Sequence, residues 1–437
     1  MSGGATAVGR DFVSLSRRLL DVVGPDGLGS ESDQMDFAVD GIEPAWVLLP
    51  GSPAEAEAVL RLCAEHDLAV VPAGSGERLG QGNPPERLDA VLSTSRLDAI
   101  VEHAAADMTL TVQAGATLSA VNEALRGSGQ WLPFDPAHPA RTSIGGLIAA
   151  NACGASRQAF GTAREWLLGV RAVLADGTAV KSGGRVVKNV AGYDLHKLLV
   201  GSFGTLAVVL EVTFKLAPLA EESRVVCFSA SETASLLHFA RALADSTLGP
   251  RFLEIVIGVD HPPLLAVGLA GLREEMGEAS ARVAGKAKEL SVVEAEEPID
   301  EAALASARDQ LERGGATDVV IRAGTWRTSL GDWLAGALER LGGCAARLTA
   351  VVHAGVGVAR LRLGDADQQA LAEVLPSLRR EAIGRAGYLV IERAPSGWKP
   401  ELDVWGPPPP TLALMKGIKA AFDPHRLLSP GRFVGGI

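Results

Sequence analysis

Apolar positions along the first hundred residues predict alternating strands and helices. Trp46–Leu49 has the pattern of a buried strand, and Ala54–His66 has apolar residues at helical spacing. Between them, Ser52 is placed to cap the helix and Pro53 suits its first position. This alternation indicates an α/β arrangement. The other predicted strands and helices before residue 218 are Phe12–Val23, Leu68–Pro72, Ala90–Leu92, Ile100–His103, Leu110–Gln113, Leu118–Arg126, Leu167–Leu174 paired with Thr178–Lys181, Leu195–Val200 capped by Asp194, and Thr205–Leu216.

The pattern changes near residue 221, where alanine-rich helices begin to alternate with strands. The helices are predicted at Glu232–Asp245, Arg273–Leu290 and Glu301–Glu312, and the strands at Val225–Phe228, Leu253–Val259, Asp318–Ala323 and Leu348–His353. A proline-rich linker, Trp405–Pro410, precedes a helix at Leu412–Phe422. We therefore expect an α+β fold with an N-terminal segment (1–39), a first domain (40–218) of two α/β subdomains, a cap domain (219–404), and a C-terminal segment (405–437) that returns to the first domain.

Composition and charge exclude several classes of protein. The 437 residues carry a formal net charge of −11, and no dense Lys/Arg run is present, so we expect no nucleic-acid partner. The cysteines, Cys63, Cys153, Cys227 and Cys344, are scattered without a CxxC pair, which disfavours zinc and iron–sulfur sites in this chain. The N-terminus lacks the pattern of a signal peptide, and no uncharged apolar run reaches ~18 residues. These features predict a cytoplasmic protein without a transmembrane segment.

Two glycine-rich segments are candidates for a cofactor site. Residues 74–80 (GSGERLG) follow a predicted strand directly, and their amides are able to cradle a diphosphate. The third glycine falls one residue too late for a Rossmann fingerprint, and no Gly-Lys-Ser/Thr of a P-loop is present. Residues 143–154 (SIGGLIAANACG) expose backbone either for close helix–strand packing or for a flat cofactor. Alone, the first loop is as consistent with a plain turn; together, the two segments favour a large cofactor containing a diphosphate.

Five collinear motifs resemble those of FAD-linked oxidases of the vanillyl-alcohol oxidase type. They are VPAGSGERLG (71–80), LPFDP (132–136), SIGGLIAANACG (143–154), KNVAGYDLHKLLVGSFGTL (188–206) and FDPHRLLSPGRF (422–433). The resemblance implies a PCMH-type FAD-binding domain followed by a cap, with FAD as cofactor. Within the family, ERAP (392–395), DVWGPPPP (403–410) and the closing GRFVGGI are similar to FAD-binding subunits of bacterial glycolate oxidases. Such subunits work with a catalytic flavoprotein subunit and an iron–sulfur subunit.

The resemblance also implies which residues hold FAD. The diphosphate cradle would be Pro72, Ala73, Gly74, Ser75, Gly76, Glu77, Arg78 and Leu79; the flavin and ribityl wall would be Ser143, Gly145, Gly146, Ala149, Asn151 and Gly154; Gly204 and Val208 would press on the adenine-ribose side or the ring edge. Residues 74–80 contain no His or Cys, although His138 and Cys153 lie nearby in sequence. We therefore expect a non-covalent flavin.

Departures from the family pattern affect the cap. Relatives that oxidise 2-hydroxy acids carry HxGDGNxH, whose histidines help to build a metal and substrate site. Here the matching stretch runs from His353 to Arg360, with Val356 and Val358 at the Asp and Asn positions, and Ser429 replaces the Asn of LNPG. The Glu-His-Gly-Ile-Gly segment is absent. Because valines bind no metal, we predict no metal site and assign no catalytic residue.

The roles of four cap and loop residues stay open between a structural and a functional interpretation. We expect His353 to be a core residue at a strand end rather than a ligand, and Arg360 to be an exposed charge. Arg322 is either a surface strand residue or a group that binds a carboxylate or a partner. Tyr193 either touches the flavin or only packs.

Three functions compete. The first is an FAD-holding subunit of a glycolate (2-hydroxy acid) oxidase complex, whose substrate is bound here or on a partner and which reaches the membrane, if at all, through its partners. The second is a stand-alone FAD-linked 2-hydroxy acid dehydrogenase such as a D-lactate dehydrogenase. The third, an assembly protein that has lost FAD, is disfavoured because the two glycine-rich segments are intact.

Overall fold

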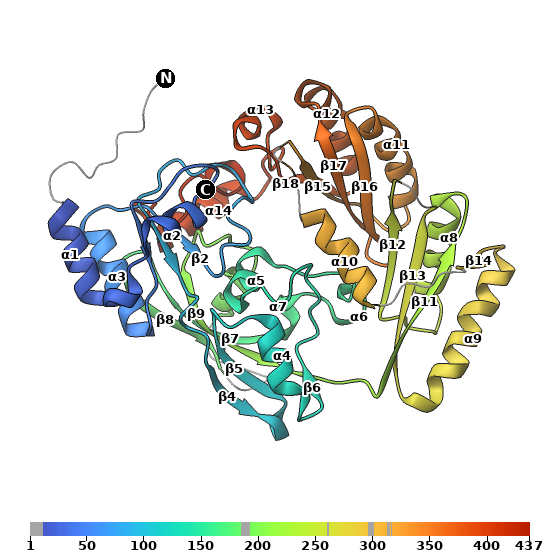
Figure 1. Cartoon of the computed structure of the whole chain (residues 1–437), viewed down its shortest axis with the longest axis horizontal. Helices are drawn as coiled ribbons and strands as arrows, with labels where there is room; N and C mark the ends of the chain where they lie inside the picture. Colours follow the sequence, from blue (N-terminus) through green and yellow to red (C-terminus); the bar gives the residue numbers. More distant parts are fainter. Residues whose placement is uncertain (1–11, 185–192, 260–261, 296–300, 313–314, 316) are drawn as a thin grey trace.

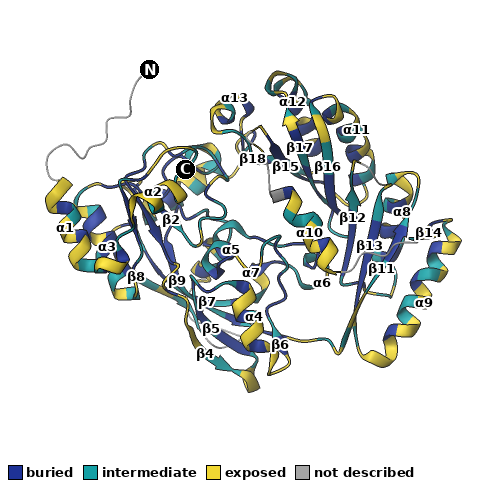
Figure 2. Ribbon diagram, in the orientation of Figure 1, coloured by how far each residue is buried: buried dark blue, intermediate teal, exposed yellow. Residues whose placement is uncertain are grey.

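The chain folds into two portions that lie side by side in the computed structural model (Figure 1). The structure describes residues 12–184, 193–259, 262–295, 301–312, 315 and 317–437. Both portions combine helices with β-sheets, so the expected α+β class is confirmed. The central strands are buried, whereas the outer helices expose one face (Figure 2).

The first portion begins with a small parallel sheet. Its strands are β1 (Trp46–Leu48), β3 (Ala90–Ser93) and β2 (Val70–Ala73), in that order across the sheet. Helix α3 (Pro53–Glu65) connects β1 to β2, and Ser52 caps it by accepting from Glu55 N, with Pro53 at the first position as predicted. Helix α1 (Phe12–Val23) packs on α3 and buries Leu15, Leu19 and Val23. Apolar faces at helical spacing therefore determine this layer. The other short elements here are the 3-10 turn η1 (Pro25–Gly27) and α2 (Glu31–Asp36).

An antiparallel five-stranded sheet completes the first portion. Its order is β4 (Ile100–Ala104), β5 (Thr109–Gln113), β9 (Val208–Lys215), β7 (Leu167–Val173) and β8 (Ala179–Gly183). The predicted hairpin of β7 and β8 is present. Helices and short elements over this sheet are η2 (Ala105–Asp107), α4 (Leu118–Arg126), β6 (Gln130–Trp131), α5 (Ile144–Ala150), α6 (Arg157–Phe160), α7 (Ala163–Trp166), η3 (Leu195–Leu198) and β10 (Ala217–Pro218), which pairs with β6. Asp194 is at the N-cap position of η3 as predicted, but its side chain forms an ion pair with Lys197 and makes no capping hydrogen bond.

The second portion is built on an eight-stranded antiparallel sheet. Its order is β14 (Val293–Glu294), β11 (Glu222–Ser229), β13 (Leu264–Gly271), β12 (Phe252–Ile257), β16 (Ala345–His353), β17 (Val358–Ala366), β15 (Val319–Gly324) and β18 (Tyr388–Arg393). Its helices are α8 (Thr233–Ala244), α9 (Arg273–Glu289), α10 (Glu301–Glu312), α11 (Leu330–Gly342) and α12 (Gln368–Gly384). The largest apolar core joins this sheet to these helices. The strands and helices of this portion that the sequence pattern did not predict include β13, β17, β18, α11 and α12.

The end of the chain returns to the first portion. After η4 (Ser396–Trp398) and α13 (Lys399–Leu402), helix α14 (Leu412–Phe422) places Ile418 and Phe422 against the core of the five-stranded sheet. Leu428 then bridges to Val70 of β2 beside the parallel sheet, and the 3-10 turn η5 (Val434–Gly436) ends the chain. The segment closing the sequence therefore lies against the glycine-rich loop that follows β2.

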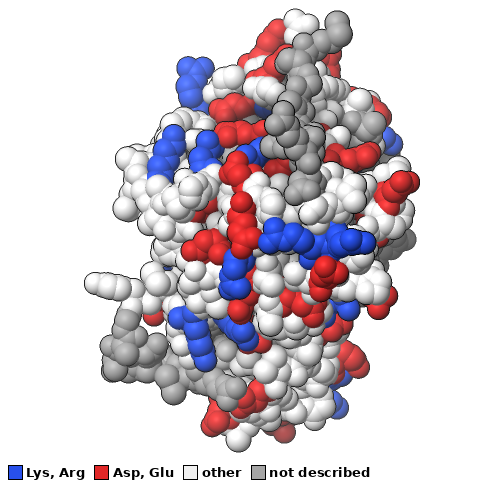
Figure 3. Space-filling model, turned by 90° about the vertical axis from the view of Figure 1, so that its left-hand side faces the viewer, with Lys and Arg blue, Asp and Glu red and all other residues white. Residues whose placement is uncertain are grey.

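Charge is dispersed over the outer face of the first portion. Acidic and basic side chains are intermingled there, without a single-sign patch (Figure 3). Among the helices of the described residues, none has the length and apolarity needed to cross a membrane.

Candidate functional site

A cavity lies where the loop after β2 meets α5. We call it the glycine cavity. Among its lining residues are the predicted Pro72, Ala73, Gly74, Ser75, Gly76, Glu77, Arg78, Leu79, Ser143, Gly145, Gly146, Ala149, Gly204 and Val208. The structure thus brings together three segments that are far apart in sequence. It also adds residues that the sequence did not indicate: Val71, Thr94, Thr142, Ala150, Ser202, Phe203, Ala207, Val209, Ser429 and Arg432.

The glycines around this cavity differ in what an added Cβ atom would contact. A Cβ on Gly74 would overlap the Ser143 side chain, whose Oγ accepts from Gly146 N and caps α5. A Cβ on Gly145 would lie 3.0 Å from that of Ala114, so this glycine allows close packing on the sheet. A Cβ on Gly146 would approach only Ser143 Oγ and would otherwise project into open space. Gly145 therefore serves close packing, whereas Gly146 leaves space beside the backbone that is compatible with a flat cofactor.

The loop after β2 offers backbone donors to the cavity. Within the described part of the chain, the amides of residues 75–78 donate to no protein acceptor, and Gly76 has a φ of 77°. A left-handed residue among successive free amides makes a concavity suited to anions. The loop therefore has the donor set that a diphosphate requires.

Buried polar side-chain atoms without hydrogen-bond partners gather at the same place. In the described residues they include Glu77 Oε1, Arg78 Nε, Ser429 Oγ and Arg432 Nη1, all on residues that line the glycine cavity. Buried polar groups are nearly always hydrogen-bonded in native proteins, so this set indicates a polar ligand. Bare backbone, free amides and buried side-chain atoms without hydrogen-bond partners together fit a large cofactor with a diphosphate.

The returning C-terminal region holds the outer side of this loop. Lys399 Nζ donates to Gly80 O (2.7 Å) and Gly82 O (3.1 Å) and pairs with the buried Asp40. Arg432 donates to Leu79 O (2.6 Å) and to Gln81 O. Burial lowers the pKa of both cations; for Arg432 it falls to about 10, so this side chain stays charged at neutral pH. Two cations thus fix four consecutive carbonyls while the amides before them stay available.

A second cavity adjoins the first between the two portions. We call it the arginine chamber, after Arg78, Arg157, Arg322 and Arg360 in its wall. Arg78, Ala150 and Phe203 line both cavities, so the two meet there. The predicted Asn151 and Gly154 belong to this chamber and not to the glycine cavity; Gly154 packs against the Asp135 backbone, where a Cβ would overlap. The other lining residues are Gln81, Pro136, Ala137, Ala152, Cys153, His353, Val356, Val358 and Glu392.

Positive charge dominates the described wall of the chamber, where Glu392 is the one acidic residue. Arg360 Nε donates to Glu392 (2.7 Å), and Arg322 Nε lies 2.8 Å from the other carboxylate oxygen. Burial opposes ionisation of Glu392, but Arg360 and Arg322 outweigh it and lower its pKa to about 2. The expectation of an exposed Arg360 is wrong, because its side chain is only 14% exposed. Arg322 likewise faces this cavity instead of being a plain surface residue, because β15 is an inner strand of the cap sheet.

His353 ends β16 and forms part of the chamber wall. It is 7% exposed, in agreement with a buried strand-end position. Desolvation, followed by the fields of Arg308, Arg360 and Arg157, lowers its pKa to about 3. The imidazole is therefore neutral at physiological pH. In the described residues no group of His, Cys, Asp and Glu side chains is arranged to hold a metal ion.

The structure also places Tyr193 and the part of the fourth motif that follows it. Tyr193 is 91% exposed and lines neither cavity, so neither flavin contact nor packing describes it. Residues 188–192 of the fourth motif lie outside the described residues. Phe203, which follows in that motif, has a φ of 55° and packs against Phe433 and Trp405, with ring centroids 5.4 and 5.0 Å away. This aromatic group anchors the returning segment where the cavities meet.

Comparisons with known proteins agree with this geometry. Residues 44–183 match a family model described as an FAD binding domain, and residues 407–433 match the C-terminal domain of FAD linked oxidases. A D-2-hydroxyglutarate dehydrogenase of Xanthomonas citri pv. viticola is 30% identical over 419 residues, which is 89% of each chain. Glycolate oxidase subunit GlcD of Bacillus subtilis is 30% identical over 259 residues, 58% of this chain and 54% of that subunit.

Solved structures support the fold. p-Cresol methylhydroxylase superposes with a TM-score of 0.78 at 16% identity, covering 98% of this chain and 97% of that one. The free amides, the unpaired buried groups and the bare backbone of the glycine cavity fit FAD, which is the cofactor of this family. The chain belongs to the FAD-linked oxidases of the vanillyl-alcohol oxidase type and is an FAD-linked oxidoreductase.

Proposed function

We propose that this chain oxidises a small anionic 2-hydroxy acid, with FAD in the glycine cavity and the substrate in the arginine chamber. The observation that carries the proposal is the shared wall of the two cavities at Arg78, Ala150 and Phe203. A chamber with a surplus of guanidinium groups suits a carboxylate, which Arg binds through paired hydrogen bonds. The names of the glycolate oxidase subunit and the hydroxyglutarate dehydrogenase fit this substrate class.

The FAD contacts follow from the lining residues. The free amides of residues 75–78 would bind the diphosphate, and Gly145, Gly146 and Ala149 would present bare backbone to the flavin. Gly204 and Val208 line the same cavity. Asn151 and Gly154, expected at the flavin, would instead border the substrate. Cys153 lies on the chamber side, and we propose that FAD is held without a covalent bond.

Bound FAD supplies a hydride acceptor for oxidation of the hydroxyl-bearing carbon. Arg322 would orient the substrate carboxylate through the end of its guanidinium, which lines the chamber while its Nε is paired with Glu392. His353 would give a neutral hydrogen-bonding group, since a pKa of about 3 does not suit a proton acceptor working at neutral pH. The apolar Val356 and Val358 limit the water that shares the chamber with substrate.

A second candidate is an FAD-holding subunit of a glycolate oxidase complex with a catalytic flavoprotein subunit and an iron–sulfur subunit. It is favoured by the similarity to subunit GlcD and by the valines at the ligand positions of the HxGDGNxH motif. In that case electrons would leave through partner chains, and any membrane association of a cytoplasmic protein would be through them.

We also propose domain limits at 40–218, 219–404 and 405–437.

An anaerobic absorbance experiment separates the two candidates. The purified chain is scanned for a flavin spectrum, and glycolate, D-lactate or D-2-hydroxyglutarate is then added. Bleaching of the flavin by the chain alone supports the first candidate. A flavin that stays oxidised until partner subunits are added supports the second. A chain purified without flavin that does not take up FAD contradicts both.

A further inference from the structure

Helix α10 places one guanidinium between the two portions of the molecule. Arg308 Nε lies 3.0 Å from both carboxylate oxygens of Glu254, and its Nη2 donates to Oε2 at 2.8 Å. The Glu254 side chain, on β12, is 0% exposed, and that of Arg308 is 13% exposed. The proposed function does not involve this pair, and because a buried ion pair is costly to desolvate, its presence is weak evidence of a purely stabilising role.

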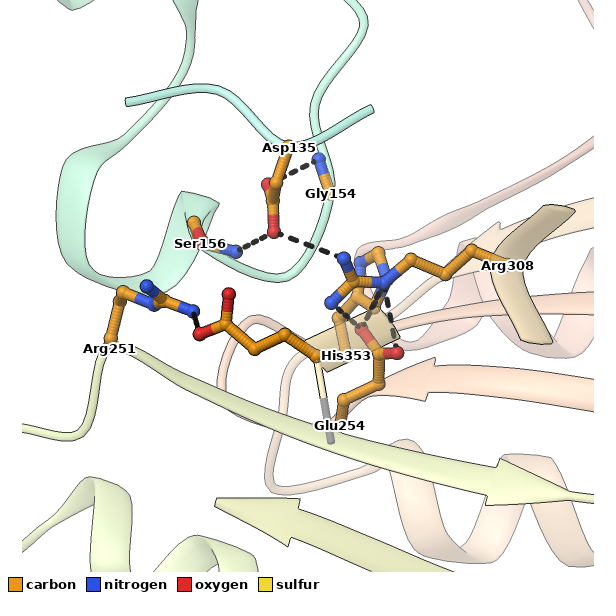
Figure 4. Close-up of polar contacts among 8 residues, drawn as sticks. Asp135, Gly154, Ser156, Arg251, Glu254, Arg308 and His353 are labelled. Atoms are coloured by element: carbon orange, nitrogen blue, oxygen red, sulfur yellow. Dashed lines mark hydrogen bonds and ion pairs between the residues drawn. The ribbon is translucent and has the colours of Figure 1, made fainter. Parts of the chain in front are cut away.

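The same guanidinium reaches the first portion. Arg308 Nη1 lies 3.7 Å from Asp135 Oδ2, in the turn of the LPFDP motif. Asp135 in turn accepts from Gly154 N and Ser156 N, each at 3.0 Å (Figure 4). These amides belong to the loop between α5 and α6. That loop carries Cys153 and leads directly into Arg157 of α6, and both residues line the chamber on the side of the first portion.

Glu254 connects Arg308 to the opposite wall. Glu254 and His353 are direct partners across β12 and β16, and His353 Nε2 lies 3.6 Å from Glu254 Oε2. His353 and the following Val356 line the chamber on the cap side. One arginine therefore joins both walls through two carboxylates, as the close-up shows (Figure 4).

Apolar packing around the network keeps water from competing with it. Ala155, Phe252 and Leu304 are buried in one cluster that includes residues of both portions. The Arg308 guanidinium lies 5.8 Å from the centre of the Phe252 ring. Beside it, a Cβ at Gly355 would overlap Gln158, so the turn after His353 and helix α6 are in close contact. In such surroundings hydrogen bonds to charged groups are strong and direction-specific.

We propose that Arg308 is a positioning residue that holds the α5–α6 loop and the end of β16 at a fixed separation, and so sets the width of the arginine chamber. It touches neither cavity itself; it acts through Asp135 on one wall and through Glu254 on the other. This role depends only on contacts within the chain. It goes beyond the proposed function, because the role is the same whichever anion enters the chamber.

Hydrogen exchange of the whole FAD-loaded chain tests the role without any substrate. Asp135→Ala removes the acceptor of two amides and the contact of Arg308 with the first portion. It leaves the Glu254–Arg308 pair inside the cap intact, together with the His138–Asp309 and Gln158–Pro250 contacts between the portions. Exchange is expected to be about ten-fold faster or more in peptides covering 151–158 and also 353–358, since both walls lose one tether. Peptides from α12 keep their wild-type rates. In the same samples FAD per chain stays constant.

A matched control removes an ion pair that does not join the portions. Arg340 pairs with Glu381 between α11 and α12, so Arg340→Gln should leave both chamber peptides unchanged. If Asp135→Ala does not fold, Asp135→Asn keeps the shape and one acceptor oxygen, and a smaller acceleration at both walls is expected. Unchanged exchange at 353–358 in the folded variant, or equal acceleration by Arg340→Gln, would overturn the proposal.

Discussion

The glycine cavity and the arginine chamber share a wall but are built in opposite ways. The first is made of contiguous backbone: free amides at residues 75–78 and glycines at the start of α5. The second is made of charged side chains from distant elements: Arg157 on α6, Arg322 on β15, Arg360 on β17 and Glu392 on β18. A cavity that binds through backbone needs a particular local sequence, whereas one that binds through side chains needs only that the fold bring them together.

The contacts that hold the two cavities in place differ as well. Cations from the returning C-terminal region hold the loop of the glycine cavity, through Lys399 and Arg432. The chamber depends on the contact between the two portions, through Arg308. The first cavity should therefore be lost by changes to its loop or to the cations that hold the loop, and the second by changes to its charged side chains or to the contacts of Arg308, with FAD still bound.

The largest expected effect comes from removing the cation under the loop of the glycine cavity. Lys399→Met leaves the Asp40 carboxylate buried without its partner and frees the carbonyls of Gly80 and Gly82. Breaking one side of a buried pair costs about 3–5 kcal/mol. Denaturant unfolding followed by flavin fluorescence measures this loss. Lys416→Met, at an exposed position of α14, is the control and should be neutral.

Filling the glycine cavity should have the next largest effect, which is on FAD binding. Gly146→Val adds bulk where only Ser143 Oγ lies within 4 Å, so the new side chain takes the space assigned to the flavin. Overpacking of this kind is expected to weaken FAD binding about 100-fold, measured by flavin content and by titration of the apoprotein. Gly417→Val, in an exposed part of α14 with open space around it, should keep its flavin. A fully loaded Gly146→Val variant would contradict the placement of the flavin.

Removing one arginine of the chamber should weaken substrate binding and leave FAD binding unchanged. Arg322→Gln takes away a charged donor, a loss of about 1.5–3 kcal/mol, so 2-hydroxy acids should bind roughly 10–100-fold more weakly while FAD content stays the same. Arg347→Gln removes an arginine of β16 whose pair with Asp365 is exposed, and it should bind substrate normally. Equal losses in the two variants would show that general charge, and not this chamber, attracts the substrate.

The effect that is smallest at neutral pH concerns the protonation of His353. His353 has a native pKa of about 3, below its ordinary 6.5, so the unfolded state binds the extra proton between these values. Stability is therefore complete above pH 6.5 and falls as pH drops toward 3, by about 1.4 kcal/mol per pH unit for this proton. Glu392, with a pKa of about 2, adds its own loss only below pH 4.5. Thermal melts between pH 4.5 and 6.5 should thus be less pH-dependent in His353→Gln than in the wild type; identical slopes would contradict the buried neutral imidazole.

The contrast between a cavity of contiguous backbone and one of distant side chains also explains which site residues the sequence predicted. The loop at 72–79 and the segment 143–149 were predicted because their glycines are adjacent in sequence, and both line the glycine cavity. Ser429 and Arg432 were missed as lining residues, since nothing in the tail shows which of its atoms turn toward the loop. The Arg322–Glu392–Arg360 group was missed because its members come from strands that are neighbours only after the cap sheet has formed. β17 and β18 went unassigned, and with them the inner place of Arg360 in the sheet.

The most direct test of the account is a titration of the FAD-loaded chain with oxalate, a dicarboxylate without a hydroxyl to oxidise, followed by the flavin absorbance spectrum. If the chamber opens onto the flavin at Arg78, Ala150 and Phe203, oxalate perturbs the spectrum with saturation in the wild type and in Arg347→Gln, and binds at least ten-fold more weakly to Arg322→Gln. A flavin spectrum that oxalate leaves unchanged, with oxalate failing to compete with substrate, would contradict the shared site.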